Sequence, residues 1–478
     1  MNLWPWSRRV RRTGAAARAM VLRAKFDSAQ TTPDNRRHWV NADHLSPDSA
    51  AGAEVRRTLR SRARYEVANN SYARGIVLTL ANDCVGTGPR LQMLTGDPEA
   101  NRQIETEFGV WAKAIGLAEK LRTMRVARAQ DGEAFGVLLT NESLDSPVTL
   151  DMRLIEADQV TTPGKSPAKK TAVDGIVLDQ FGNPIEYHVL KEHPGGAEAA
   201  LNMKYERVPA ESMIHWFRAD RPGQHRGVPD ILPALPLFAQ LRRYTLAVIG
   251  AAESAANIAL FMKTNAPAGG EAAEVEPMAT MEFEPNMAIF GPEGWEPSQV
   301  RAEQPATGYG EFKREILNEI ARCLNMPYNI AACNSSGYNY ASGRLDHQTY
   351  FKSIRVEQSH VETSVLDRIL AAWLAEALRV FGLQGIDHWP HQWFWDGHEH
   401  VDPAKEAKAQ ATRLANHTTT LATEYARVGL DWETELNQRA KEKALMEELG
   451  LSTAEAAPRA SQGDENEDDE REVEHAAA

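Results

Sequence analysis

Cysteine is scarce in this chain, with three in 478 residues: Cys84, Cys323 and Cys333. An odd and widely spaced set argues against a disulfide framework and favours a reducing compartment. No two of them have the CxxC spacing of a structural zinc site. We therefore expect all three to be buried as small apolar side chains.

Positive charge is also in short supply, because the formal net charge is −13. This disfavours a globally basic nucleic-acid binder but leaves room for a local basic patch. The charge is unevenly placed. Residues 1–37 carry nine Lys or Arg against two acids, and residues 464–474 carry eight acids in eleven positions. Blocks of like charge repel themselves, so we expect both ends of the chain to be solvated arms.

Long hydrophobic runs are nearly absent. The start of the chain, MNLWPWSRRVRR, has no apolar run of signal-peptide length, and we do not expect secretion by the ordinary route. Residues 244–262 are long enough to span a membrane and carry one charge, Glu253. They are rich in alanine, however, and are interrupted by Ser254 and Asn257. We expect a helix packed between neighbouring subunits, with a membrane-inserted oligomer as an alternative.

Motifs for nucleotide binding and nucleophilic catalysis are missing as well. There is no GxSxG nucleophile elbow. The tripeptide GKS at 164–166 is a partial match to a phosphate-binding loop, but that loop needs a glycine where Gln159 stands. A lysine-rich surface loop is the better interpretation.

A short histidine-rich segment could bind metal. His398 and His400 would share one face of a strand, and His388 or His391 could add a ligand. The HExxH zinc motif fails because its second histidine is replaced by Asp402. A polar strand edge is favoured. We predict no catalytic residue, no metal and no cofactor, with a nucleic-acid-processing enzyme as an alternative function.

Helical and strand-like patterns alternate along the chain and predict an α+β fold. One or two helices are expected between residues 50 and 86, with a polar face of five arginines. Short apolar runs separated by turns predict strands from residue 86 to about 205, around a helical insert at 99–124. Helices are expected at 236–262, 309–324, 345–380 and 403–449, with a break at Gly429 and an N-cap at Asp431, and a histidine- and tryptophan-rich strand pair at 386–400. The five arginines are Arg56, Arg57, Arg60, Arg62 and Arg64.

The segment NSSGYNYASGR, residues 334–344, is an unusual loop because it joins two helices and carries one charge, on Arg344. Gly337 and Gly343 would let its backbone flex or reverse. Ser342 is placed to cap the long helix that follows, and Gly382 would end that helix. An ordinary helix–helix connection is the alternative interpretation of this loop.

Four segments, in order, resemble the lambda family of bacteriophage portal proteins. The specific one is RPGQHRGVP, residues 221–229, which leads into the helix at 236. The last residues of the loop, Asn339 to Arg344, are similar to the family's Asn-Tyr-Ser-Ser-x-Arg, with departures at Ala341 and Gly343. The resemblance covers about residues 60–450. The other two segments are NNSYARGIVLTLANDCVGTGPRLQ at 69–92 and a helical stretch at 401–436.

The resemblance implies a portal-protein fold: an α+β wing, a two-helix stem, a small clip, a long wing helix and a helical crown. The predicted divisions are a basic N-terminal arm at 1–60, the wing at 61–235, stem helices at 236–262 and 306–325, the clip at 263–305, a tunnel loop at 326–344, the long wing helix and following strands at 345–400, the crown at 401–452 and an acidic tail at 453–478.

The resemblance also implies a function. The chain would form a homo-oligomeric ring, expected to be a dodecamer, at one capsid vertex, and double-stranded DNA would pass through it. The terminase large subunit, head-completion or connector proteins, and the major capsid and scaffold proteins would be its partners, in the virion and, during assembly, in the host cytoplasm. The tunnel loop would face the DNA through Asn334, Ser335, Ser336, Tyr338, Asn339, Tyr340 and Arg344.

Overall fold

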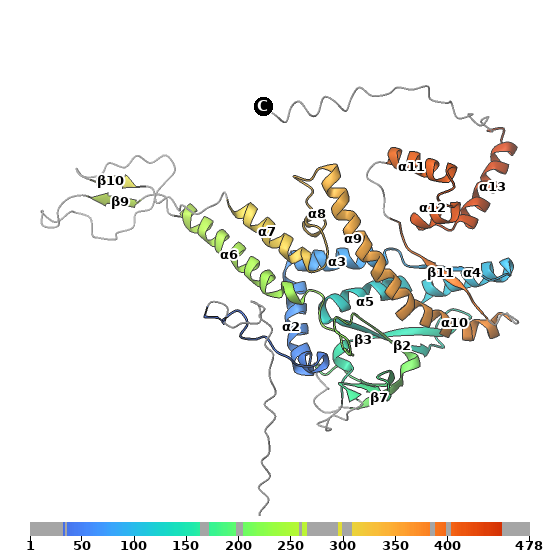
Figure 1. Cartoon of the computed structure of the whole chain (residues 1–478), viewed down its shortest axis with the longest axis horizontal. Helices are drawn as coiled ribbons and strands as arrows, with labels where there is room; N and C mark the ends of the chain where they lie inside the picture. Colours follow the sequence, from blue (N-terminus) through green and yellow to red (C-terminus); the bar gives the residue numbers. More distant parts are fainter. Residues whose placement is uncertain are drawn as a thin grey trace, which may run out of the picture.

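The computed structural model describes residues 32–33, 36–162, 172–196, 204–257, 261–264, 295–298, 308–382, 388–397 and 403–451. The fold is elongated (Figure 1). A two-helix arm ending in a strand pair extends from one side of a mixed helix–strand body, and three helices lie at the other side. The predicted α+β class is confirmed.

The body begins with the turn α1 (Pro47–Ala50) and the helices α2 (Ala53–Asn69) and α3 (Ser71–Val85). Asn70 separates the two helices because its backbone is extended and its side-chain oxygen accepts the amides at the start of α3. The predicted boundary at residue 60 therefore lies inside a helix.

The helical insert predicted at 99–124 consists of two helices, α4 (Pro98–Ala114) and α5 (Leu117–Asp131). They are separate because Gly116, with φ at +64°, turns the chain through the left-handed region. The strands pair antiparallel in separate sheets. Their order is β3–β2–β8 in one sheet and β4–β5–β6–β7 in another, with the bounds β2 (Glu133–Thr140), β3 (Leu150–Ile155), β4 (Ala172–Val173), β5 (Ile176–Leu178), β6 (Pro184–Leu190), β7 (Tyr205–Pro209) and β8 (Met213–Phe217).

The strand pair expected at 386–400 is wrong within its described part, because that part holds one strand, β11 (His391–Phe394). Its partner is β1 (Arg90–Met93), three hundred residues earlier in the chain. The pairing is antiparallel and runs from Arg90 opposite Phe394 to Met93 opposite His391. A local strand pattern cannot reveal a partner so far away, and this pairing joins the two halves of the body.

The long helix expected at 345–380 begins earlier, at Tyr340, and contains an irregular turn. It consists of α9 (Tyr340–Val361), a π-helical turn (Glu362–Leu366) and α10 (Asp367–Val380). A π turn shifts the faces of a helix relative to one another. Here it lies over the main core, where Val361, Val365 and Leu366 are all buried. Gly382, with φ at +68°, follows the end of the helix.

The main hydrophobic core lies where α4 and α10 cross the sheets. Phe108 and Trp111 of α4 face Trp373 of α10, with ring centroids 5.3 and 6.2 Å from its own. The indole Nε1 of Trp111 donates to the carbonyl oxygen of Leu150 at 2.8 Å, which satisfies its polar atom. The core thus fixes the far end of the long helix to the part of the body at residues 61–235, for which we keep the name wing.

The arm consists of α6 (Leu235–Asn257) and α7 (Tyr309–Arg322), and it leads to the pair β9 (Phe261–Thr264) and β10 (Trp295–Ser298). The helix predicted at 236–262 is therefore too long at its end, where β9 begins. Tyr244 of α6 packs on Phe312 of α7, with ring centroids 4.8 Å apart. Among the described helices, none is long and apolar enough to cross a membrane.

The C-terminal helices are α11 (Pro403–Ala415), α12 (Leu421–Arg427) and α13 (Trp432–Glu448). Asp431 caps α13 as predicted, because its side chain accepts the amide of Thr434 at 2.9 Å. A break at 416–420, where His417 has φ at +54°, was not predicted. We keep the name crown for these three helices.

Several predicted features fall outside the described residues. They are the GKS tripeptide at 164–166, His398 and His400, most of the segment at 263–305, and the acidic residues at 464–474.

Candidate functional site

The loop singled out by sequence lies between the short helix α8 (Tyr328–Ala332) and α9. It is shorter than predicted, because residues 340–344 already belong to α9. The remaining segment, residues 333–339, has no charged side chain and is exposed at every position except the half-buried Tyr338. In Figure 1 the start of α9 and strand β7 lie on opposite sides of the body.

The loop holds its shape through its own hydrogen bonds. Ser335 and Tyr338 close a β-turn, because the amide of Tyr338 donates to the carbonyl oxygen of Ser335 at 3.2 Å. Gly337, at the third position of this turn, has φ at +83°, which a type II turn requires and glycine allows. The side-chain oxygen of Asn334 accepts the amide and the hydroxyl of Ser336 at 2.9 and 2.7 Å. The predicted backbone reversal therefore occurs at Gly337.

The cap of the long helix is Asn339 and not Ser342 as predicted. The side-chain oxygen of Asn339 accepts the amide of Ser342 at 2.8 Å, while Ser342 lies in the first turn. Gly343 is likewise helical and does not act as a second hinge. Arg344 is exposed on α9. Tyr340 begins that helix, and its side chain lies outside the described part of the structure.

Arg314 of α7 anchors the loop to the arm. Its Nη2 donates to the carbonyl oxygen of Ser336 at 2.9 Å, and its guanidinium lies 5.3 Å from the centre of the Tyr328 ring. The contact with the Tyr328 ring is a cation–π interaction. The hydrogen bond pairs one N–H of the guanidinium with a backbone carbonyl of the loop. The loop, α7 and α8 are therefore one connected unit.

Further along α9, buried polar contacts connect this helix to the body. The Tyr350 hydroxyl donates to Asp83 of α3 at 2.7 Å, and burial together with this carboxylate raises the pKa of Tyr350. Two turns of helix later, Glu357 accepts from Arg128 of α5 at 3.1 Å and also pairs with Arg125. Arg125 in turn lies 3.0 Å from Asp230, just before the arm begins. This network links α9, α5 and the base of α6.

The motif RPGQHRGVP has a structural role. Its Arg226 is fully buried and directs its guanidinium at Glu133 of β2, with an Nη2–Oε1 distance of 2.7 Å. Arg60 of α2 and His215 of β8 contact the same carboxylate, His215 at 3.1 Å. Burial alone would raise the pKa of Glu133, but Arg226, His215 and Arg60 together hold it well below its usual value.

The two glycines beside this ion cluster leave no room for a side chain. A Cβ at Gly227 would collide with the backbone of Gly132, and a Cβ at Gly132 would collide with the backbone of Val228. Gly132 also has φ at +91°. The chain segments therefore cross here at backbone contact, which explains one glycine of the motif by packing.

The arginines of α2 were predicted on a polar face, and this is wrong for two of them. Arg56 and Arg60 are 1% and 4% exposed. Arg60 pairs with Glu133 and with Asp158, and Arg56 pairs with Asp174. These acids lie far away in the sequence, so helical periodicity treats the arginines as solvent-facing.

The expectation of three buried cysteines is also partly wrong. Cys84 is buried, and burial raises its pKa, whereas Cys323 is half-buried and Cys333 is exposed at the start of the loop. Cys333 adopts the left-handed conformation, with φ at +49°, in which it ends α8.

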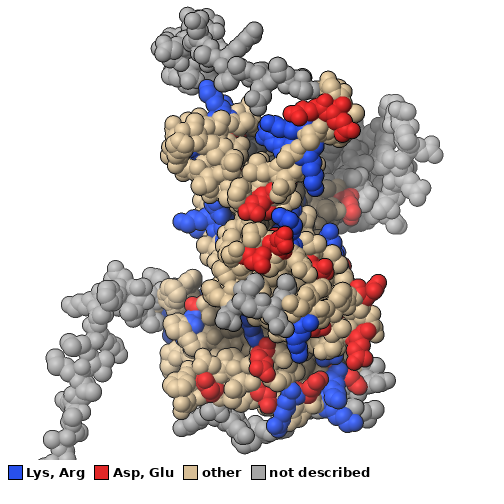
Figure 2. Space-filling view, turned by 90° about the vertical axis from the view of Figure 1, so that its right-hand side faces the viewer, with Lys and Arg blue, Asp and Glu red and all other residues tan. Residues whose placement is uncertain are grey.

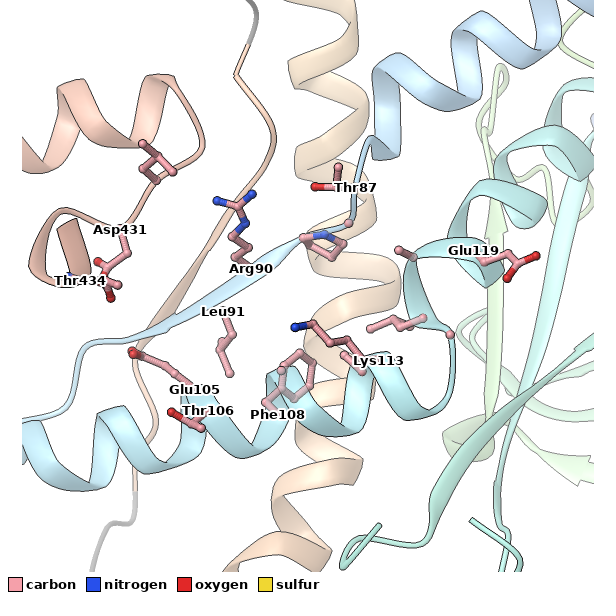
Figure 3. A pocket seen from close by; sticks show the side chains of 18 of the residues that line it. Thr87, Arg90, Leu91, Glu105, Thr106, Phe108, Lys113, Glu119, Asp431 and Thr434 are labelled. Carbon is pink, nitrogen blue, oxygen red and sulfur yellow. The ribbon is translucent and has the colours of Figure 1, made fainter. Parts of the chain in front are cut away.

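A groove of about 790 Å³ separates the wing from the crown (Figure 3). Phe108 and Lys113 of α4 form one wall, Arg90 of β1 another, and Asp431 and Thr434 stand at the crown side. Both signs of charge line it, and acidic and basic side chains also interleave on the face shown in Figure 2. The groove presents no constellation for catalysis.

One cluster of potential metal ligands occurs among the described residues: Glu156, Asp158 and His193, with ligand atoms within 4.8 Å of one another. It does not suit a cation, because Arg64 lies 2.8 Å from the Asp158 carboxylate. The amide of Gly195 donates to His193 Nδ1 at 3.0 Å, so the proton of the neutral ring is on Nε2, 2.7 Å from Glu156. That nitrogen therefore has no free lone pair to offer to a metal.

Comparison with known proteins adds the family. The model of a family described as phage portal protein, lambda family, matches residues 33–358. A protein named probable portal protein, from Halomonas phage phiHAP-1, is 25% identical over 470 residues, which cover 91% of this chain and 89% of that protein.

Of the similar solved structures, one supports a shared fold. A chain from the neck of an empty GTA particle with C6 symmetry has a TM-score of 0.50 at 14% identity, covering 81% of this chain and 99% of its own. A chain from the virion of a native gene transfer agent particle has a TM-score of 0.48 at 14% identity, covering 77% and 92%.

Proposed function

The chain belongs to the lambda family of phage portal proteins, and on that premise we propose that its copies form a closed ring at one vertex of a capsid, through which double-stranded DNA enters and leaves. A dodecamer is the expected copy number. The similar chain from the GTA particle neck comes from an assembly with C6 symmetry, which a dodecameric ring contains.

The observation that carries the ring is the uncovered face of α6. Beyond Leu241 none of its described residues is buried, and Leu246 and Ile249 are 60% and 48% exposed. The contact with α7 covers the side of Tyr244, which leaves these two side chains to solvent. An apolar helix face of this kind is stabilised by burial against another protein surface. In a ring, the neighbouring copy supplies that surface.

The loop at 333–339 is the proposed contact with DNA in the channel. Two features of the loop support this contact: it is exposed and it carries no charge. It also lies on the side of the body opposite β7 (Figure 1). A lysine or arginine that holds a phosphate adds salt-dependent affinity, which would slow DNA that has to pass. Hydroxyl and amide groups such as those of Ser336 and Asn334 can touch phosphates without such a hold. Anchoring by Arg314 would keep the loop in place under load.

The remaining partners follow from the same proposal. The clip around β9 and β10 would be the docking site of the terminase large subunit, which supplies ATP hydrolysis, and later of head-completion proteins. The wing would contact the major capsid and scaffold proteins. The protein would be found in the virion at the portal vertex, after assembly in the host cytoplasm.

The ring is tested by electron microscopy and mass measurement of the purified full-length chain. We expect closed rings for the wild type and for a control, Gln240→Glu, on an exposed position of α6. The variant Leu246→Glu with Ile249→Glu should shift the population to single subunits, because it places charges in the proposed interface. A wild-type chain that stays monomeric at high concentration would contradict the proposal.

A further inference from the structure

The crown lacks a hydrophobic core of its own. Among residues 403–451, all of which the structure describes, no apolar side chain is buried, and the one buried side chain is that of Glu424. Glu424 accepts from Arg413 at 3.0 Å, so a polar contact holds α11 against α12. A helical unit is normally stabilised by burying one apolar face of each helix. The crown therefore needs another surface to complete it.

The second half of α13 shows the deficiency most clearly. Every residue from Asn437 to Leu451 is exposed. Leu445 and Leu449, 54% and 61% exposed, lie one turn apart on the same face, and Met446 is beside them. An isolated helix of this length is marginal in water. Its apolar end is thus an exposed surface that burial against a partner would stabilise.

The attachment of the crown to the wing does not use this surface. The contacts lie at the joint between α12 and α13, where Gln92 of β1 donates to Asp431 at 2.7 Å and Arg90 donates to the carbonyl oxygen of Gly429. A Cβ at Gly397 would collide with the backbone of Arg427, so the segment after β11 also touches the joint closely. The joint fixes the start of α13, while its apolar end extends away from the body (Figure 1).

The charges of the crown helices suggest which surface covers it. The helix α11 has three basic residues and one acid, whereas α13 has five acids and three basic residues. In a head-to-tail ring, two different faces of identical subunits meet, so oppositely charged helices of one chain can pair between neighbours. Exposed alanines at 404, 407, 411 and 415 recur along α11 at helical spacing and would let a second helix approach closely.

We propose that the crown is completed by a second copy of the chain, with the apolar end of α13 packed against α11 of the neighbouring subunit. This inference rests on the ring proposed above. It adds that the crown is ordered by ring assembly and is not a stable unit in the single subunit.

Hydrogen exchange of the full-length protein tests this inference. Ring and single-subunit fractions are separated by size, and exchange is followed by mass spectrometry. We expect the amides of residues 437–449 to exchange about 100-fold more slowly in rings, because local opening then requires the interface to break. Amides of β2 should exchange alike in both fractions. Equal exchange of α13 in the two fractions would overturn the inference, as would protection already present in the single subunit, which would indicate cover by the chain's own tail.

A matched pair of variants locates the surface. Leu445→Asn with Leu449→Asn removes the apolar face, whereas Ala440→Asn with Ala444→Asn makes uncharged polar changes at exposed positions away from that face. We expect the first variant to form rings in which α13 exchanges as in the single subunit, and the second to behave as the wild type. Rings with an equally protected α13 in both variants would refute the contact. Rings with an unprotected wild-type crown would refute this inference alone, whereas a wild type that forms no rings would refute the ring itself.

Discussion

The guanidinium of Arg226 lies against the carboxylate of Glu133 with neither side chain exposed to solvent. Nε is 3.0 and 2.9 Å from the two carboxylate oxygens, and Nη2 is 2.7 Å from Oε1. The arginine belongs to the most specific motif of the chain, and its partner stands at the start of β2. The motif therefore joins the central strand of the wing to the segment that leads into the arm.

Removing the charge of Glu133 should lower the free energy of unfolding of the wing. In Glu133→Gln, the buried Arg226 and Arg60 lose the carboxylate that they share and keep only Asp174 and Asp158 as charged partners. We expect a loss of about 3 kcal/mol in the free energy of unfolding. The control is Glu186→Gln, whose partner Arg207 is 65% exposed and which should lose less than about 1 kcal/mol. Urea unfolding followed by circular dichroism measures both. Similar losses in the two variants would show that the buried ion pair matters no more to stability than an exposed one.

The glycine crossing beside this pair should tolerate no side chain. Gly227→Ala would force apart the backbones of residues 132 and 227, and we expect insoluble or unfolded protein. Gly75→Ala is the matched change, because Gly75 lies inside α3 with open space around it. That substitution should stabilise the chain by about 0.5–1 kcal/mol, since alanine favours the helix. Soluble yield and thermal unfolding of the two variants are the measurements. A normally folded Gly227→Ala protein would contradict the packing described above.

Substitutions in the loop must separate DNA contact from helix capping. Asn339→Ala should destabilise the start of α9 by about 1 kcal/mol, whereas Asn339→Ser keeps a cap. Tyr338→Ala leaves the cap intact, and we expect it to form rings and to reduce the amount of nuclease-resistant DNA in particles. The measurement is DNA content per particle for the three variants. Normal packaging and retention with Tyr338→Ala would argue that the loop is an ordinary connection.

Acid should weaken the fold before it protonates ordinary carboxylates. Burial lowers the pKa of His215 in spite of its contact with Glu133, and burial followed by Arg128 lowers the pKa of His360. In the unfolded chain both would titrate near 6.5, so below that pH the unfolded state binds more protons and is favoured. We therefore expect the free energy of unfolding to fall as the pH drops from 7 to 5.

The pH effect is checked by urea unfolding at pH 7, 6 and 5. His215→Gln should lose less stability over this range than the wild type, whereas a control at the exposed His44, His44→Gln, should follow the wild type. A further loss of stability is expected below about pH 4.5. The pKa of Glu133 is depressed in the folded state, so the unfolded chain binds this proton at a higher pH than the folded chain does. If the free energy of unfolding falls equally with pH in His215→Gln and in the wild type, His215 does not cause the acid sensitivity.

Local signals predicted the elements that depend on neighbours in the sequence. Helical periodicity indicated the two arm helices and the long helix, and Asp431 was identified as a cap because capping acts over three residues. Helix ends were less certain. Asn339 and Ser342 are both good caps, and the choice between them depends on where the chain leaves the turn at Gly337.

The sequence by itself determined the α+β composition, the family and the uncharged loop, because composition, spacing and motif order are properties of the chain alone. Only the tertiary structure decided the partners. Arg56 and Arg60 are buried ion-pair residues because Asp174 and Glu133 come from segments far along the chain, and β11 pairs with β1 across three hundred residues. Long-range pairing of this kind leaves no periodic mark in a sequence, since its free energy comes from contacts that exist only after the chain has folded.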